Sequence, residues 1–437
     1  MQVVVIGTGF VGVVTAAALA SFGNQVTGLD IDPAKVASLQ EGEVPFFEPG
    51  LTDLLKQELK NGRLRFTSSY QEAIPDAQVI LVAVGTPSAP DGTADTTYVE
   101  AACQESAKYI ADDVVIGIKS TVPPGIFSIL TKKIKSITDK NFYLASLPEF
   151  LREGTAVEDT LHPDRVVIGC REAAAIERLK HLHEPFQAPI VIANPESAQM
   201  GKYAANAYLA QRITFINQIA DLCEENGADV QEVIKIIGHD KRIGDHYWYP
   251  GFGYGGSCFP KDVRELAAYS RSVGQGDNLF NKINELNENR PHLKLQDFAE
   301  SIGGWQDKKV AVLGLSFKPN TDDLREAPSL KVVPQLLHKG AQVKAYDPMA
   351  MAAWRRQVGA KPHLSLVDTL AEAVTDAEVI ILLIEWPEIV GFDFASLPAL
   401  AGGQRRTLID VRNQLDPAKF STDQWLYLSI GRKNDQR

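Results

Sequence analysis

Several features are scarce in this sequence of 437 residues. Only four cysteines occur, none of them in a C-x-x-C pair: Cys103, Cys170, Cys223 and Cys258. This excludes a disulfide framework and favours a reducing compartment. No apolar run reaches the ~18 residues of a membrane span. The N-terminus enters a strand pattern without a cationic leader, so we expect no signal peptide and a cytoplasmic location.

Positive charge is also scarce, since 44 Lys and Arg face 55 Asp and Glu and leave a formal net charge of −11. This balance argues against nucleic acid or an anionic membrane as the main partner, although it leaves room for a local basic pocket. The 8 histidines include no H-E-x-x-H pattern, and His181-x-His183 has no acidic or cysteine partner at ligand spacing, so we predict no metal site. With 45% hydrophobic residues, the chain can bury a core in each of two to four domains.

The N-terminal part alternates apolar runs with helical patterns. Runs rich in Val, Ile and Leu occupy residues 3–6, 25–29, 79–84 and 114–118, and each ends at Gly, Asp or Ser-Thr. Near-continuous apolar runs are typical of strands that are buried on both faces of a parallel sheet. They predict a doubly wound α/β domain with helices as the crossovers.

The same pattern returns near the C-terminus. Residues 309–314, 341–347 and 376–384 resemble residues 2–7, 24–30 and 76–84, in the same order. Three matched segments predict a second α/β domain from about residue 305. The fold class is therefore α/β, with two Rossmann-like doubly wound domains.

A segment without strand patterns separates the two α/β domains. Residues 196–225 read as one long helix with an apolar stripe formed by Leu209, Ile213, Ile216, Ala220 and Cys223. The stripe could join the outer domains or pair with another subunit, and the sequence leaves both open. We expect three domains: residues 1–195, an all-α domain of residues 196–300, and residues 301–437.

A glycine motif, Gly7-Thr-Gly9-Phe-Val-Gly12, follows the first strand and opens a helix, and Asp30 ends the next strand. Such glycines allow a tight turn and bring backbone N–H groups close to a pyrophosphate at a helix N-terminus. Asp30 would accept hydrogen bonds from the ribose hydroxyls and repel a 2′-phosphate, which favours NAD over NADP. The alternative is a tight turn in another α/β fold.

Two threonines and two glutamates are further candidates. Thr86 and Thr121 follow strands of the first sheet, where ligands of open α/β sheets bind, although both also suit ordinary turns before proline. Glu149 and Glu153 would share one face if their segment were helical, and such a pair could act as a general base. A solvated helix start explains the glutamates equally simply.

The strongest candidate for covalent chemistry is Cys258. It follows the glycine-rich residues 251–256, which cannot form a stable helix, and Lys261 stands close by to favour the thiolate. The other three cysteines fall in helical patterns or at a strand end, as inert buried thiols do. Lys202 and Asn206 lie at i and i+4 and could stabilise an oxyanion, although a charged surface stripe has the same spacing.

Together these motifs resemble one family, the nucleotide-sugar 6-dehydrogenases of the UDP-glucose/GDP-mannose dehydrogenase type. The resemblance runs from Met1 to about Ile430 and includes, in the family's order, G-x-G-x-x-G, V-G-T-P, S-T-V-P-P-G, P-E-F-L-R-E-G, G-K-Y-x-x-N, G-G-S-C-F-P-K-D and F-K-P-N-T-D-D-L-R-E-x-P-S. It implies an N-terminal NAD-binding domain, a central helical domain that makes a homodimer, and a C-terminal domain that binds the sugar nucleotide.

The resemblance also implies the reaction, two successive NAD-dependent oxidations of the C6 alcohol of UDP-glucose to give UDP-glucuronate. Cys258 resembles the nucleophile that forms a thiohemiacetal and then a thioester. Lys202 and Asn206 match the oxyanion-stabilising pair, and Glu149 matches a residue that assists hydrolysis. Thr121 and Asp262 match the positions that hold the water.

The resemblance assigns further residues to the ligands. Those that match NAD contacts are Gly7, Gly9, Phe10, Val11, Gly12, Asp30, Lys35, Thr86, Thr121, Glu153, Lys261 and Arg325. Those that match the substrate side are Glu149, Phe150, Leu151, Arg152, Glu153, Lys202, Asn206, Tyr247, Trp248, Tyr249, Pro250, Gly251, Gly255 and Lys318. Arg242 matches a substrate-binding arginine that the family reaches across from the neighbouring subunit.

One departure from the family bears on the choice of sugar. Tyr247-Trp248 stands where the family commonly has Phe-Leu, so Tyr247 adds a hydroxyl at a substrate-facing position. UDP-N-acetylmannosamine or GDP-mannose would use the same cysteine chemistry. A non-catalytic nucleotide-sugar-binding protein is a third reading, but it would be expected to lose Cys258, Lys202 or Asn206.

Overall fold

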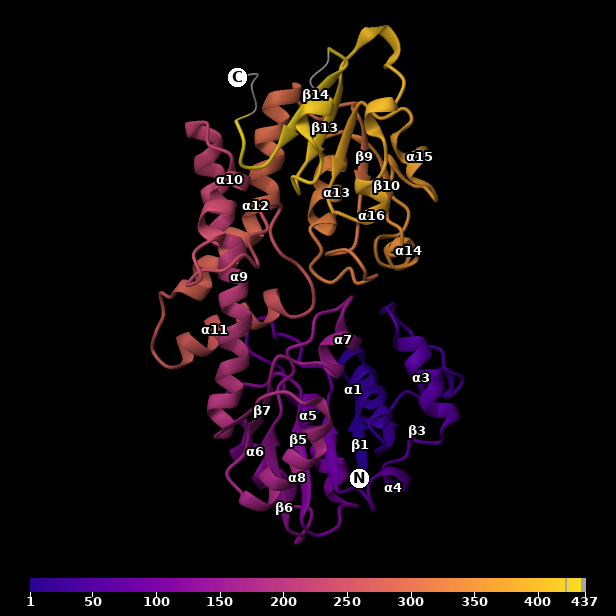
Figure 1. Ribbon diagram of the computed structural model, residues 1–437, viewed down its shortest axis with the longest axis vertical. Coiled ribbons are helices and arrows are strands. Elements are labelled where there is room, and N and C mark those ends of the chain that lie inside the picture. Colours follow the sequence, from indigo (N-terminus) through magenta and orange to yellow (C-terminus); the bar gives the residue numbers. More distant parts are fainter. Residues whose placement is uncertain (421–422, 434–437) are drawn as a thin grey trace. The chain divides into compact units, whose positions relative to one another are not determined.

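The computed structural model describes residues 1–420 and 423–433. The chain divides into two compact units (Figure 1). Unit 1 comprises Met1–Ala205 and Arg264–Gly276, and unit 2 comprises Asn206–Val263 and Asp277–Arg437. Within the described ranges, no helix combines the length and the apolar composition of a membrane span.

Unit 1 is built on a sheet with the strand order β3-β2-β1-β4-β5-β6-β7-β8. All neighbouring strands are parallel except β6 and β7. The strands are β1 (Gln2–Ile6), β2 (Gln25–Leu29), β3 (Leu64–Thr67), β4 (Val79–Val82), β5 (Val114–Ile118), β6 (Phe142–Ser146), β7 (Val166–Gly169) and β8 (Ile190–Ala193). The four predicted strands are therefore confirmed, and β3, β6, β7 and β8 were not foreseen.

Helices cover both faces of this sheet, which explains its near-continuous apolar strands. In β1, Val3 and Val5 belong to one hydrophobic core, while Val4 and Ile6 belong to the core on the opposite face. The first core includes residues of α1 (Phe10–Ser21), α2 (Pro33–Gln40), α3 (Leu51–Lys60), α7 (Ala156–Leu161) and α8 (Ala173–His183). The second includes residues of α4 (Tyr70–Ala73), α5 (Thr97–Ala107) and α6 (Ile126–Lys135).

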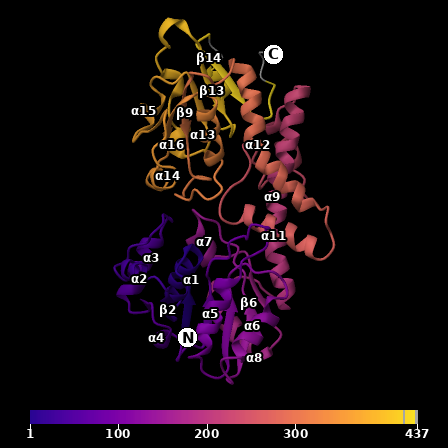
Figure 2. The ribbon, with the colours of Figure 1, turned by 180° about the vertical axis from the view of Figure 1, so that it is seen from behind.

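Four helices follow the first sheet in the chain: α9 (Pro195–Asn226), α10 (Val230–Gly238), α11 (Phe259–Ser272) and α12 (Leu279–Ile302). The predicted long helix is confirmed, since α9 extends the expected range by one residue at each end. Figure 2 shows α9 beside α12, and ion pairs join Asp221 of α9 to Arg290 and Lys294 of α12.

For part of the apolar stripe of α9, the structure excludes one of the two possibilities that the sequence leaves open. Ile216 and Ala220 are completely buried, and Cys223 is nearly so, in the hydrophobic core of unit 2. One of the two possibilities, that the stripe pairs with another subunit, is therefore wrong for these residues, because their own chain already covers them. A different set of α9 side chains is exposed: Tyr208, Phe215 and Leu222.

Unit 2 contains a six-stranded sheet with the order β11-β10-β9-β12-β13-β14, and all its pairs are parallel. Its strands are β9 (Lys309–Leu313), β10 (Gln342–Tyr346), β11 (Leu364–Leu366), β12 (Val379–Leu382), β13 (Arg406–Asp410) and β14 (Trp425–Ser429). The α-helices between these strands are α13 (Ser329–His338), α14 (Met351–Val358), α15 (Leu370–Val374) and α16 (Pro387–Val390). Short 3-10 turns occupy Glu184–Phe186, Phe394–Ser396, Ala401–Gly403 and Pro417–Phe420.

The predicted internal repeat is confirmed by the two strand orders. β9, β10 and β12 hold the same places in their sheet as β1, β2 and β4 hold in the first. In each sheet the strand order reverses beside the central strand, where doubly wound folds bind ligands. The protein is thus α/β, with two Rossmann-like sheets and a long helix between them in the chain.

Candidate active site

The glycine motif of unit 1 forms the turn between β1 and α1. Gly7 has a φ of +90°, and a Cβ at Gly12 would lie only 1.8 Å from the Gly7 carbonyl oxygen. Both glycines are therefore required by the fold itself. Gly9 differs, because a Cβ there would meet no atom within 4 Å. Its lack of a side chain leaves space above the N-terminus of α1, as the approach of a pyrophosphate requires.

Asp30 directly follows β2 and lies beside this turn. The backbone N–H and the hydroxyl of Thr8 donate to Asp30 Oδ2 over 2.9 and 2.7 Å, and Lys35 Nζ donates to the same oxygen over 2.8 Å. Burial by itself raises the pKa of the Asp30 carboxyl, but the hydrogen bonds from Lys35 and Thr8 outweigh it and lower the pKa overall. Asp30 is therefore held as an anion next to the glycine turn, where it would repel a 2′-phosphate.

The corresponding position of the second sheet is used differently. Asp347 follows β10 and accepts hydrogen bonds on both carboxylate oxygens, from the backbone N–H groups of Leu315, Ser316, Met349 and Ala350. The hydroxyl of Ser316 and the indole of Trp386 also lie within hydrogen-bond reach of Oδ2. With an exposure of 1%, this carboxylate is committed to the fold and has no capacity left for a ribose.

Glu149 and Lys202 form the charged centre of a second group in unit 1. Lys202 Nζ donates to the Glu149 carbonyl oxygen over 2.7 Å and to its Oε1 over 3.0 Å, and it lies 5.3 Å from the centre of the Phe150 ring. Both charged side chains are almost completely buried. Burial lowers the pKa of the nearby Lys119 ammonium, and the charge of Lys202 acts in the same direction against the opposing effect of Glu149.

The segment that carries Glu149 and Glu153 is not helical, so these glutamates do not share a helix face as the spacing suggested. Instead, residues 149–152 line a cavity of about 300 Å³ in unit 1. Glu48, which sequence reasoning missed, fixes the end of this segment by accepting hydrogen bonds from the backbone N–H groups of Gly154 and Ala156, each over 2.7 Å. No local pattern indicates a partner more than a hundred residues away.

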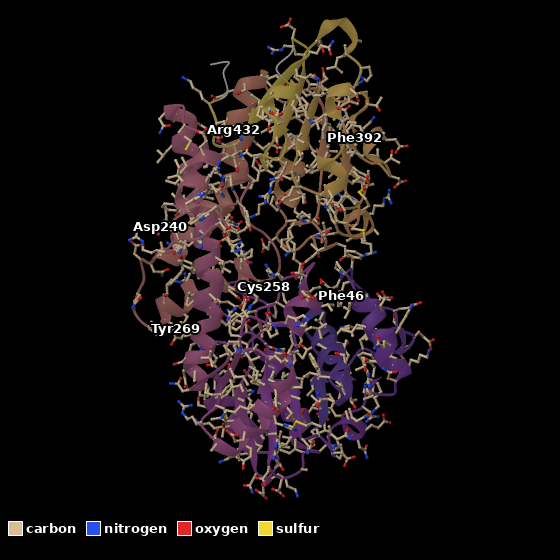
Figure 3. All side chains as sticks on the ribbon, viewed as in Figure 1. Phe46, Asp240, Cys258, Tyr269, Phe392 and Arg432 are labelled. Carbon is tan, nitrogen blue, oxygen red and sulfur yellow. The ribbon has the colours of Figure 1, made fainter. Side chains whose placement is uncertain are left out.

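In unit 2, Cys258 stands at the junction of the glycine-rich loop and α11 (Figure 3). Its carbonyl oxygen accepts the N–H of Asp262 over 2.8 Å, so the residue caps the helix, and its Sγ lies 3.4 Å from Ser257 Oγ. A thiolate here would face the positive end of the α11 dipole. Cys258 is half-buried, whereas the other three cysteines are buried.

The other three cysteines are buried free thiols, as the sequence predicts. Burial raises the pKa of Cys103 to about 12 and that of Cys170 to about 11. It also raises the pKa of Cys223. Each of these environments opposes ionisation and suits packing rather than nucleophilic chemistry.

Asp262, on the first turn of α11, contacts two other predicted site residues. The Asn206 amide donates to Asp262 Oδ2 over 2.5 Å, and Lys261 Nζ lies 2.7 Å from Asp262 Oδ1. Asp262 has an exposure of only 1%. The structure therefore brings Asn206 of α9 together with Lys261 and Asp262, which lie on the helix that begins directly after Cys258.

The segment before the glycine-rich loop carries predicted substrate contacts. Tyr247 has a φ of +64°, and its ring lies 5.7 Å from that of Tyr249 and 6.0 Å from that of Phe259. Trp248 points into the protein, where its indole donates to the Gly244 carbonyl oxygen and packs 3.9 Å from the Arg212 guanidinium. A substrate contact through Trp248 therefore stays a prediction.

The structure gives other contacts for several further predicted residues. Arg242 is 87% exposed and pairs with Asp240. The guanidinium of Arg325 pairs with Asp323 over 2.7 Å, and Lys318 Nζ lies 5.5 Å from the Phe317 ring centre. In unit 1, Thr86 is buried and Thr121 half-buried. Their ligand roles stay predictions, and no group of three His, Cys, Asp or Glu suited to a metal ion occurs within residues 1–420 and 423–433.

Three sequence models of one protein family each match a different part of the chain. They describe the UDP-glucose/GDP-mannose dehydrogenase family: its NAD binding domain matches residues 1–187, its central domain residues 196–289, and its UDP binding domain residues 311–417. The chain belongs to the UDP-glucose/GDP-mannose dehydrogenase family. It is an NAD-dependent dehydrogenase whose substrate is a nucleotide sugar.

Individual members of the family match over nearly the whole chain. UDP-glucose 6-dehydrogenase YwqF of Bacillus subtilis is 39% identical over 99% of this chain and 98% of its own. UDP-glucose 6-dehydrogenase of Pseudomonas aeruginosa is 41% identical at the same two coverages. A solved UDP-glucose dehydrogenase from Pyrobaculum islandicum superposes with a TM-score of 0.91 at 35% identity, covering 99% of this chain and 97% of that one.

Proposed function

We propose that this family member oxidises UDP-glucose to UDP-glucuronate in two NAD-dependent steps, through covalent intermediates on Cys258. One observation carries the proposal: a half-buried cysteine caps α11, and the first turn of the same helix presents Lys261 and Asp262, the latter bonded to Asn206. A thiol, a carboxylate and amide and ammonium donors are the groups that thioester formation and hydrolysis need.

The proposed roles follow from the chemistry of each side chain. NAD⁺, held at the glycine turn of residues 7–12 and by Asp30, would supply the hydride acceptor for each oxidation. Cys258 adds as a thiolate to the C6 aldehyde and forms a thiohemiacetal, which becomes a thioester when its hydride leaves. Asn206 and Lys202 donate hydrogen bonds to the oxygen that gains negative charge, and Asp262 and Thr121 hold water.

Hydrolysis then releases the product and restores the thiol. Glu149, which accepts from Lys202 in unit 1, assists the attack of water on the thioester. In total, one C6 alcohol, two NAD⁺ and one water give one carboxylate, two NADH and three protons. The balance requires no other oxidant, so the yield of NADH per sugar reports directly on the number of oxidations.

The choice of sugar is tested by a panel of nucleotide sugars. We expect UDP-glucose to give NADH with a kcat/KM at least tenfold above those of UDP-N-acetylmannosamine and GDP-mannose. A solved UDP-D-ManNAc dehydrogenase from Pyrococcus horikoshii, 26% identical with a TM-score of 0.86, makes the first of these the alternative substrate. A higher kcat/KM with that sugar would replace UDP-glucose in the proposal and leave the cysteine chemistry in place.

The proposal also assigns the domains and the assembly. Residues 1–195 would bind NAD, residues 196–300 would form the helical dimerisation domain, and residues 301–437 would bind the UDP moiety.

A homodimer is supported by the exposed α9 stripe, because Tyr208, Phe215 and Leu222 are spaced seven apart and are each at least half exposed. The exposed Arg242 would then reach the partner's substrate. The four free thiols support a cytoplasmic location.

A further inference from the structure

The glycine-rich loop that leads to Cys258 has no regular secondary structure to hold it. Gly253 and Gly256 have φ values of +93° and +88°, a backbone conformation that the loop reaches only at glycine. A loop of this composition has high conformational entropy when free. Its conformation must therefore be set by contacts from surrounding elements.

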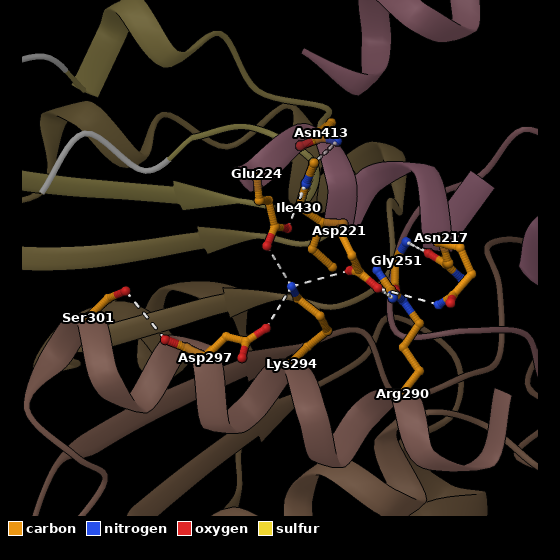
Figure 4. Close-up of polar contacts among 12 residues, drawn as sticks. Asn217, Asp221, Glu224, Gly251, Arg290, Lys294, Asp297, Ser301, Asn413 and Ile430 are labelled. Atoms are coloured by element: carbon orange, nitrogen blue, oxygen red, sulfur yellow. Dashed lines mark hydrogen bonds and ion pairs between the residues drawn. The ribbon is translucent and has the colours of Figure 1, made fainter. Parts of the chain in front are cut away.

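Two buried side chains hold the loop at Gly251 (Figure 4). The Gly251 N–H donates to Asn217 Oδ1 of α9 over 2.9 Å, and the Gly251 carbonyl oxygen accepts from Arg290 Nε of α12 over 2.6 Å. Arg290 is in turn oriented by Asp221, whose two carboxylate oxygens lie 3.0 and 2.9 Å from Arg290 Nη1. Both backbone groups of Gly251 are thus fixed by side chains on two helices.

A third side chain holds the loop nearer to the cysteine. Asn287 Oδ1 accepts the N–H of Tyr254 over 2.8 Å, and Asn287 Nδ2 donates to the Tyr254 carbonyl oxygen over 3.0 Å. The amide therefore pairs with this residue as a neighbouring strand would. A Cβ at Gly253 would lie 2.5 Å from Asn287 Oδ1, so the glycine permits this close approach. Asn217, Asn287 and Arg290 are between 2% and 6% exposed.

We propose that Asn287 and Arg290, with Asn217, are positioning residues for the covalent steps. In this role they act through the backbone of the loop that ends at Cys258, to which their side chains are hydrogen-bonded. The proposal rests on the function proposed above, in which Cys258 is the nucleophile. A shift of the loop by about 1 Å would misplace the thiolate relative to the aldehyde and cost on the order of 100-fold in rate.

The sharpest variant is Asn287→Asp, which keeps the shape of the side chain and the acceptor for the Tyr254 N–H. It places an oxygen where the amide nitrogen donated to the Tyr254 carbonyl, so one attraction becomes a repulsion. We expect kcat for NADH formation to fall at least tenfold, while KM for NAD⁺ changes by less than twofold. Asn289→Asp, the same substitution at an exposed site of α12, should leave both constants within twofold.

A purely structural role would give a different result. If Asn287 only stabilised the fold, kcat would stay within twofold of wild type at temperatures where the variant is folded, and that result would overturn the inference. Parallel changes in kcat and KM for NAD⁺ would overturn it as well. Failure of the proposed function is separate, because wild type would then form no NADH from the sugar or would keep its kcat in Cys258→Ser.

A second pair of variants covers the case in which Asn287→Asp does not fold. Asn217→Asp keeps an acceptor for the Gly251 N–H, whereas Asn217→Leu has a similar size and removes it. We expect Asn217→Asp to retain kcat within threefold and Asn217→Leu to lose at least tenfold, with an unchanged KM for NAD⁺. Equal kcat values in the two variants would contradict the positioning role.

Discussion

Lys294 of α12 is a buried cation with three acidic partners, and its removal gives a quantitative test of how the helical part of unit 2 is held. The ammonium group lies 2.7 Å from Glu224, 2.8 Å from Asp297 and 3.5 Å from Asp221, and the side chain is 3% exposed (Figure 4). Burial by itself lowers the pKa of Lys294, but the carboxylates more than offset it and raise the pKa overall.

Lys294→Met removes the charge and keeps a similar helix propensity. The three carboxylates, which are 18% to 45% exposed, would then repel one another without a cation. Because water screens them in part, we take the lower end of the range for breaking a buried ion pair and expect a loss of about 3 kcal/mol. Lys282→Met on the same helix removes an exposed pair with Glu285, which is worth at most about 1 kcal/mol.

Tryptophan fluorescence in urea measures this difference, because all five tryptophans lie in unit 2. With a urea m-value of roughly 3 kcal/mol/M for a unit of this size, the Lys294→Met midpoint should fall by about 1 M, and the Lys282→Met midpoint by less than about 0.3 M.

The pH dependence follows from the raised pKa of Lys294. The stabilisation from its charge is complete below the ordinary lysine pKa of 10.5 and is lost as the pH rises through the raised folded-state pKa. The gap between wild type and Lys294→Met should therefore be constant from pH 7 to pH 9 and narrow only above pH 10.5. Equal midpoint shifts for the two variants at pH 7 would refute this account of the cluster.

Three further predictions concern the cofactor turn and the assembly. Asp30 should make kcat/KM at least 100-fold higher with NAD⁺ than with NADP⁺, and comparable values for the two cofactors would contradict its assigned role. Gly9→Ala should raise KM for NAD⁺ without a change in the unfolding midpoint. Gly12→Ala should instead lower the unfolding midpoint, because its Cβ would overlap the Gly7 carbonyl oxygen. Similar changes in KM and midpoint for the two variants would argue against the open space at Gly9. Phe215→Glu should turn a dimer into a monomer in sedimentation at micromolar concentration, and an unchanged dimer would exclude the exposed α9 stripe as the interface.

The sequence predicts those parts of the fold that have a distinctive local pattern of apolar residues. Strands β1, β4 and β5 could be predicted because their apolar residues alternate between two covered faces. β8 was missed although Ile190–Ala193 is an equally apolar run, and its Val191 and Ile192 are 48% and 42% exposed rather than covered on both faces. The stripe of α9 was correctly seen as buried, but periodicity does not say whether the same chain or another copy covers a helix face.

Some residues of the candidate site could be predicted from the sequence, and others could not. Cys258 and the glycine turn could be found because unusual residues stand together in the sequence. Asn217, Asn287 and Glu48 could not, because each binds backbone groups far away in the chain and no residue type marks a backbone acceptor or donor. Glu149 and Lys202 were both named, but their direct pairing follows only from the tertiary fold.

The central claim is the covalent role of Cys258, and the most direct measurement is NADH formed per UDP-glucose by wild type and by the four single Cys→Ser variants, with mass spectrometry of each protein. Wild type and the Cys103, Cys170 and Cys223 variants should form two NADH per sugar. Cys258→Ser should lose nearly all of this activity, because a hydroxyl is a far poorer nucleophile at neutral pH, and any ester that it forms should remain as trapped sugar on the protein. A Cys258→Ser enzyme that keeps near-wild-type kcat and still yields two NADH per sugar would contradict the covalent mechanism.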